Sequence, residues 1–313
     1  MRVSAIVCTR NRPRPVAEAV RWLLEDENPE FELIVVDQSD GQDSEKALAV
    51  WRKDPRFRYI RSSRRGKGAA LNDGLAEARG SIVAFTDDDC RVPYGWAMEM
   101  AKVLEAHPTA AIAFCRVVAV PHDKNTGYVP AYDPPGNRLL RSITQVRNGL
   151  GLGAAMALRK EFAVSMGGFD ESFGPGGRFP SGDEWDISMR ALLKGWHVYE
   201  TTELAVVHDG FRTFAEGRLH ARRDWIALGA VCAKPLRAGY LRAVVVPLWF
   251  FSARALWPPL ANVLRLRRPS GLGRISGFLQ GFADGLMTTV DPVTLLFVGT
   301  DLNQALPNSV RSV

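Results

Sequence analysis

A short apolar strand that ends in three consecutive carboxylates constrains this chain more than any other stretch. Residues 81–90 read Ser-Ile-Val-Ala-Phe-Thr-Asp-Asp-Asp-Cys, and Gly80 precedes them. Their length and β-branched content are typical of a buried strand. Three adjacent Asp side chains repel one another unless a cation lies among them, and Mg²⁺ is usually held by one or two carboxylates plus substrate phosphates. For the triplet alone, a solvated acidic turn is the alternative.

Composition is that of an ordinary globular protein. Of its residues, 46% are hydrophobic and 24% charged, which is typical of globular proteins. With 313 residues, the chain is long enough for one large domain or two. Its four cysteines are scattered, without metal-finger spacing, which favours reduced thiols in a cytosolic setting. The N-terminus enters an apolar strand at once, so we expect no signal peptide.

Strands alternate with helices through the first half of the sequence. Strands are expected at 3–8, 31–36, 57–60 and 81–87, and helices at 13–25, 43–51 and 69–78. This alternation predicts a Rossmann-like α/β fold with a mostly parallel sheet and helices on both faces. Ligands of such sheets bind beyond the carboxyl ends of the strands, so Asp37 and the Asp triplet are expected on one rim.

The second half is less regular. We expect a helix at 95–106, a strand at 110–120, a long irregular stretch at 121–137, a helix from 183, and a strand-like pair that ends at His208. Irregular stretches of that length are usually lids or binding loops, or else disordered.

Composition changes near residue 225, where we place a boundary between a catalytic domain, 1–224, and a basic helical region, 225–313. Residues 225–283 contain no acid but eight basic side chains. Within them, the apolar run 243–264 is long enough to cross a bilayer, but Pro247, Arg254 and the Pro258–Pro259 pair interrupt it. We therefore expect an interfacial membrane element, and a helical cap or a subunit interface is equally compatible with the pattern.

Two segments suggest backbone contact with a ligand. Residues 149–154 match the G-x-G-x-x-A dinucleotide pattern, but no strand precedes them, so close approach to a sugar or to a neighbouring strand is favoured. Arg64, Arg65 and Lys67, with glycines around them, come just before an expected helix. Taken alone, such a segment is more typical of a solvated basic loop, but the acidic cluster about twenty residues further on favours phosphate binding.

Residues 182–186, Gly-Asp-Glu-Trp-Asp, open a helix with three acids in its first turn. Acids are favoured at a helix start by the dipole, so capping is the alternative to catalysis, and the two are compatible. Trp185 could stack on a sugar ring or simply pack. His208, at the end of an apolar strand, is a weaker candidate ligand.

Six segments together resemble family 2 inverting glycosyltransferases with the GT-A fold. They are residues 3–12 (VSAIVCTRNR), 33–40 (LIVVDQSD), 66–75 (GKGAALNDGL), 85–89 (FTDDD), 167–171 (GGFDE) and 182–186 (GDEWD). They occur in the order typical of the family and extend over about two thirds of the chain. The resemblance implies a GT-A domain with a C-terminal helical appendage.

The resemblance also implies a donor site. Thr9 and Asp37 would hold the base and ribose, with Arg12 nearby, while Lys67 and Asn72 would lie near the phosphates. The triplet matches the family's D-x-D motif: Asp87 and Asp89 would hold Mn²⁺ or Mg²⁺, with Asp88 beside the nucleotide and His208 as a further metal ligand.

In the family's G-E-D-x-D motif the second acid is the usual base, which points to Glu184. Because the first two acids are exchanged here, Asp183 remains a candidate. Gly168, Trp185 and Asp186 are expected on the acceptor side. The resemblance thus implies a metal-dependent inverting transfer from a UDP-, GDP- or dTDP-sugar to a glycan, a lipid-linked acceptor or a small molecule, in the synthesis of cell-surface polysaccharide or glycoconjugate.

Two other functions are alternatives to sugar transfer. A sugar nucleotidyltransferase would carry glycines after the first strand, which this chain lacks. A non-catalytic membrane- or nucleic-acid-binding protein would leave the acids without a role, so we expect no nucleic-acid partner. We expect a cytoplasmic protein at the inner face of the membrane, with peripheral contact through 225–285. The sequence leaves open the nucleotide, the sugar, the acceptor, the linkage and the oligomeric state.

Overall fold

The computed structural model describes residues 2–299, except the side chain of Asn148. The predicted region 225–313 is therefore described only to residue 299, and 300–313 lie outside the described residues. The first half contains β1 (Val3–Thr9), α1 (Pro13–Leu24), β2 (Phe31–Asp37), α2 (Asp43–Leu48), β3 (Phe57–Arg61), α3 (Lys67–Glu77), β4 (Ile82–Asp87), β5 (Cys90–Arg91) and α4 (Trp96–Ala106).

The second half begins with β6 (Ala110–Ala119), β7 (Gly127–Tyr128), β8 (Arg138–Leu140), β9 (Met156–Arg159), α5 (Lys160–Ser165), α6 (Asp183–Leu193), β10 (His197–His208) and β11 (Arg212–Thr213). It ends with α7 (Phe214–Arg237), α8 (Val245–Trp249), α9 (Trp257–Leu264), α10 (Leu272–Met287), β12 (Thr289–Val290) and β13 (Phe297–Val298).

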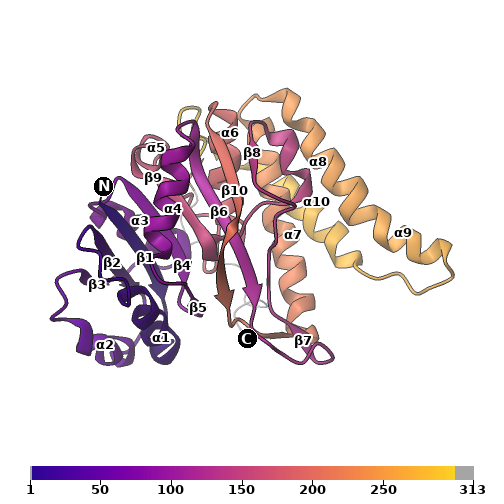
Figure 1. Cartoon of the computed structure of the whole chain (residues 1–313). Coiled ribbons are helices and arrows are strands. Elements are labelled where there is room, and N and C mark those ends of the chain that lie inside the picture. The colour runs from indigo at the N-terminus through magenta and orange to yellow at the C-terminus, as the bar shows by residue number, and fades with distance from the viewer. Residues whose placement is uncertain (1, 300–313) are drawn as a thin grey trace.

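A mixed sheet organises the molecule (Figure 1). Its strands follow the order β3-β2-β1-β4-β9-β6-β10-β5, and β8 pairs with β10. The strands β3, β2, β1 and β4 are mutually parallel, whereas β9 runs antiparallel between β4 and β6. Residues 197–208, expected as a pair of strands, form the single strand β10.

Successive side chains of a strand point to opposite faces, so β1 contributes to two cores. Ile6 packs with residues of α3 and α6, while Val3 and Val7 pack with residues of α1 and α4. Helices therefore cover both faces of the sheet. Together with the C-terminal helices, this confirms the predicted fold class.

The C-terminal region forms helix α7, a helical rod that includes α8 and α9, and helix α10 beside the sheet (Figure 1). Helix α7 begins at the capping box of Thr213 and Glu216 and continues without interruption past residue 225. Residues Leu241–Leu264 form one helical rod of 24 residues, the only described segment long and apolar enough to cross a membrane, which is weak support for spanning.

The rod accommodates the prolines that were expected to interrupt it. Its central segment, Phe250–Leu256, is π-helical, and Pro258 and Pro259 follow within the first turn of α9. A π-helical turn shifts the hydrogen-bond register, so a proline without an N–H can follow without breaking the helix.

Candidate active site

The ends of three strands form the rim on which the acidic residues lie. Thr9 at the end of β1 pairs with Asp37 of β2, and Cys8 pairs on the other side with Asp87 of β4. The predicted placement of two acidic positions on one rim is therefore what the structure shows.

The three consecutive carboxylates have three different sets of partners. Asp87 Oδ1 accepts a hydrogen bond of 2.7 Å from Lys67 Nζ. Asp88 accepts from Thr9 Oγ1 at 2.7 Å and from the Arg12 guanidinium, and Asp89 accepts from the same guanidinium at 2.9 Å. Cationic and hydroxyl groups thus offset the repulsion expected within the triplet.

These surroundings shift the pKa values of Asp88 and Asp89 in opposite directions. Burial raises the pKa of Asp88 to about 6, against the opposing charge of Arg12. Burial also acts to raise the pKa of Asp89, but the hydrogen bonds and charges of His208 and Arg12 outweigh it and hold that pKa below its usual value. Asp89 is therefore the more readily ionised member of the pair.

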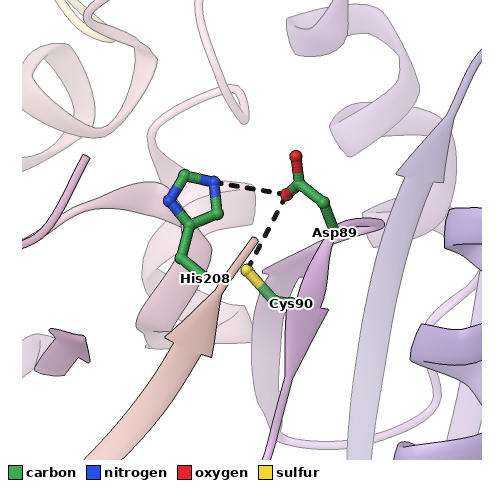
Figure 2. Close-up of side chains that lie close together, drawn as sticks. All are labelled: Asp89, Cys90 and His208. Atoms are coloured by element: carbon green, nitrogen blue, oxygen red, sulfur yellow. Dashed lines mark hydrogen bonds and ion pairs between the residues drawn. The ribbon is translucent and has the colours of Figure 1, made fainter. Parts of the chain in front are cut away.

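Asp89, Cys90 and His208 lie together where β5 pairs with the end of β10 (Figure 2). His208 Nε2 is 3.3 Å from Asp89 Oδ1, and Cys90 Sγ is 4.0 Å from the same oxygen. The backbone oxygen of Pro130 accepts a hydrogen bond of 2.9 Å from His208 Nδ1–H, which leaves Nε2 facing Asp89. A histidine held in this way is suited to metal binding through Nε2, so the residues fit the expected divalent ion.

Lys67 connects this rim to the second acidic motif. Its Nζ lies 2.7 Å from Asp87 and 3.9 Å from Asp183 Oδ2. The sequence predicted a helix from about residue 69, but α3 begins at Lys67, after Gly66 with φ of +98°. That left-handed conformation favours glycine and places Lys67 in the first helical turn. Lys67, Asp87 and Asp183 line one narrow cleft.

Glu184 lies beside Gly153, which lines the same cleft. It follows Asp183 in the first turn of α6, and a Cβ placed on Gly153 would lie 3.8 Å from Glu184 Oε2 and 3.7 Å from Lys67 Nζ. Burial, and then the charge of Asp183, raise the pKa of Glu184 well above its usual range, against the attraction of Lys67. A carboxylate with a raised pKa beside a lysine is suited to accepting a proton.

The glycine run 149–154 supplies close backbone approach. A Cβ on Gly151 would lie 2.2 Å from the Phe114 ring, and Gly153 approaches the acids. The segment does not follow a strand, so the dinucleotide interpretation has no structural support.

A larger cavity, of about 660 Å³, lies between α1 and α2, and none of the predicted site residues lines it.

Two predicted nucleotide-binding residues are already engaged by the protein. Asp37 is fully buried, and its oxygens accept from the Ser39 backbone and the Tyr59 hydroxyl, both at 2.7 Å. The Asn72 amide bonds Phe169 through both of its ends, which attaches α3 to the loop that follows α5.

The predicted acceptor-side residues are also packed. Gly168 is buried, and a Cβ there would lie 2.4 Å from Asn72 Oδ1. The Trp185 ring contacts Phe250 edge-on at 5.5 Å between centroids. Asp186 is buried, with one oxygen accepting from Arg190 at 2.8 Å and the other from Lys234 at 2.5 Å.

A buried ion cluster behind the site was not predicted from the sequence. Lys234 Nζ of α7 lies 2.5 Å from both Asp170 and Asp186, and Arg190 completes the charge balance. Lys234 also lies 4.5 Å from the Phe297 ring centroid. The only sequence signal was a lysine in an otherwise apolar part of the acid-free segment. Cys90 was likewise missed as a neighbour of the metal candidates, although it directly follows the Asp triplet.

Comparisons with known proteins find similar sequences and structures. The profile described as "Glycosyl transferase family 2" matches residues 4–167. An uncharacterized glycosyltransferase of Rickettsia conorii is 31% identical over 88 residues, which is 28% of this chain and 15% of that protein. The succinoglycan biosynthesis protein ExoO of Rhizobium meliloti is 35% identical over 88 residues, 28% of this chain and 25% of that protein. The matches thus span a quarter or less of either relative.

Among solved structures, the mannosyltransferase PcManGT of Pyrobaculum calidifontis, in complex with GDP-Man and Mn²⁺, superposes with a TM-score of 0.60. The match covers 91% of this chain and 87% of that one at 20% identity. At this identity the likeness shows a shared fold.

Proposed function

The chain belongs to glycosyl transferase family 2, and we propose that it moves a sugar from a nucleoside-diphosphate sugar to an acceptor hydroxyl with inversion at the anomeric carbon. The observation that carries this proposal is the bridge formed by Lys67. By contacting Asp87 and lying 3.9 Å from Asp183, it joins the metal motif and the base motif in one cleft. A transfer needs both acids, one near the leaving diphosphate and one near the attacking hydroxyl.

Glu184 is the proposed base. As its carboxylate accepts the proton of the acceptor hydroxyl, that oxygen forms a bond to the anomeric carbon, and the bond from this carbon to the diphosphate oxygen breaks. The electron pair leaves with the diphosphate, whose charge Lys67 would help to neutralise. Asp183 is the alternative base, and its proximity to Lys67 favours a role in positioning that lysine.

Asp89 and His208, with Asp87, would hold a divalent ion, Mn²⁺ or Mg²⁺. Such an ion supplies charge neutralisation at the departing diphosphate, an effect worth several kcal/mol. The orientation of His208 by Pro130 and the short distance between His208 Nε2 and Asp89 support this assignment. Thr9 and Arg12 would then act mainly by holding Asp88 and Asp89 in place.

The donor and the acceptor are proposed by class. PcManGT was solved with GDP-Man and Mn²⁺, and the name of ExoO refers to polysaccharide synthesis. We propose a UDP-, GDP- or dTDP-sugar as donor and a glycan or lipid-linked acceptor in cell-surface polysaccharide synthesis. A cytoplasmic location at the inner membrane face agrees with four free cysteines.

A donor screen tests the proposal. The purified protein is incubated with UDP-, GDP- and dTDP-sugars, with Mn²⁺, Mg²⁺ or chelator, and release of the nucleoside diphosphate is measured. We expect slow, metal-dependent hydrolysis of one donor class, reduced in Glu184→Gln. Release of pyrophosphate when a sugar phosphate and a nucleoside triphosphate are supplied would instead identify a sugar nucleotidyltransferase.

A further inference from the structure

The helical rod Leu241–Leu264 presents an apolar stripe to solvent. Exposed side chains recur at successive turns, interrupted once by Ser252: Leu241, Val245, Leu248, Leu256, Leu260 and Leu264. Leu241 is 75% exposed, Leu248 62% and Leu264 68%. At about 1.5 Å per residue, the stripe is about 36 Å long. An exposed apolar surface of this length indicates a binding partner.

The opposite side of the rod packs against the protein. Val246, Phe250 and Ala255 are buried there, and Phe250 contacts Trp185, the neighbour of Glu184. Crossing a bilayer would pull these side chains out of the core and expose the core to lipid. The rod is therefore suited to lying along a surface and not to spanning it.

Unpaired arginines follow the stripe. Arg265, Arg267 and Arg268 are exposed in the loop after α9, the tip of the helical projection in Figure 1. None of the three forms an ion pair within residues 2–299, and no acid occurs between 225 and 283. Leu266, between them, is 98% exposed. A complementary partner must be apolar along the stripe and anionic at its end.

We propose that the stripe and the arginine tip, residues 265–268, bind the surface of an anionic lipid bilayer, with the stripe at the boundary between headgroups and acyl chains. A second copy of this chain is less suitable, because pairing two stripes would bring one acid-free segment against another. The inference goes beyond sugar transfer and does not rest on it, since binding needs neither donor nor acceptor.

Each arginine near an anionic surface strengthens binding about five-fold, so the three at the tip together contribute about 100-fold. Full-length protein is mixed with sedimentable vesicles of two compositions. One is phosphatidylcholine alone, and the other is phosphatidylcholine with about a third of the anionic lipid phosphatidylglycerol. We expect strong sedimentation only with the anionic vesicles, and release by high salt.

Two variants test the two parts of the surface. Leu248→Glu/Leu260→Glu removes apolar contact, and Arg265→Gln/Arg267→Gln/Arg268→Gln removes charge. The matched control is Val50→Glu/Val164→Glu, because both valines are exposed apolar residues on other elements. We expect the charge variant to bind about 100-fold more weakly and the stripe variant to lose binding, while the control and all thermal unfolding midpoints stay unchanged.

Absence of sedimentation with anionic vesicles would overturn the proposal, as would equal loss in the control. Binding that resists both high salt and alkaline carbonate would show a spanning helix and would also overturn it. Light scattering gives a third outcome: a dimer that the stripe variant converts to a monomer, without vesicle binding, would show that a second copy covers the stripe.

Discussion

At the scale of single residues, the Asp triplet shows how far identical side chains can differ in role. Asp87 faces Lys67, Asp88 is enclosed by Thr9 and Arg12, and Asp89 faces His208. The sequence predicted that a cation belongs among these acids, because their repulsion could be read directly from the residues. It could not rank them, since their partners lie about 20 to 120 residues away in the sequence and meet them only through the sheet.

Replacing Asp89 by Ala should remove the divalent-ion dependence of nucleotide binding, because the best-ionised carboxylate of the cluster is lost. Isothermal titration with the donor nucleotide, with and without Mn²⁺, measures this. Asp209→Ala is the control, since that side chain is half-exposed and its ion pair among residues 2–299 is with exposed Arg91. If nucleotide binding by Asp89→Ala depends on Mn²⁺ as strongly as in the parent protein, Asp89 is not a metal ligand.

Turnover should fall on the acid side of a pKa above the ordinary glutamate value, because burial disfavours the Glu184 carboxylate and a protonated base cannot accept the acceptor's proton. As pH rises through that pKa, turnover should rise. Glu184→Gln should lower turnover by about 10²-fold or more and abolish this acid limb, with donor affinity retained. If Asp183→Asn behaves so and Glu184→Gln stays active, the two roles are reversed.

At the scale of elements, periodicity predicted the interiors of helices and strands better than their ends and partners. Helix α3 begins two residues earlier than expected because Gly66 adopts a left-handed conformation, which composition cannot reveal. Strand β9 was not foreseen because four residues carry little periodic signal. The rod was expected to be interrupted by prolines, since a π-helical turn that accommodates them has no sequence signature.

Helix α10 packs closely on α7 through glycines. A Cβ on Gly281 would lie 1.8 Å from the Ile226 backbone oxygen, so Gly281→Ala must push the helices apart. We expect a loss of about 1–3 kcal/mol in the free energy of unfolding, measured by denaturant titration. Gly273→Ala, in the same helix, would meet only Arg222 at 4.0 Å and should be neutral or slightly stabilising. Equal effects of the two substitutions would contradict close packing as the cause.

At the scale of the whole molecule, the C-terminal region is bound to the catalytic part through charge. Lys234 of α7 contacts Asp170 and Asp186, and the latter lies on the helix that also carries Glu184. The change in composition near 225 was visible in the sequence, and the boundary placed there remains a prediction. The long-range ion contacts were not visible, because nothing in the order of residues pairs a lysine with acids 48 and 64 positions earlier.

Lys234→Met should destabilise the whole fold, because among residues 2–299 it leaves buried Asp170 without a cationic partner and buried Asp186 with Arg190 alone. Breaking a buried ion cluster from one side typically costs about 3–5 kcal/mol, which denaturant unfolding would resolve. Lys194→Met, at an exposed lysine outside the cluster, should change stability by less than about 0.5 kcal/mol. If Asp170→Asn, which leaves the Asp186–Arg190 pair balanced, fails to restore stability to Lys234→Met, charge imbalance is not the reason for the loss.

The ion cluster of Lys234 also bears on how such a chain can diverge. Because one lysine balances acids from two separate motifs, these three positions are expected to be inherited together. A recombinant that joined residues 1–224 to the C-terminal helices of a relative would keep both acids and could lose their cation. Exchange of C-terminal regions between such enzymes is then restricted to partners that supply a cation at the position of Lys234, whatever surface their helices present.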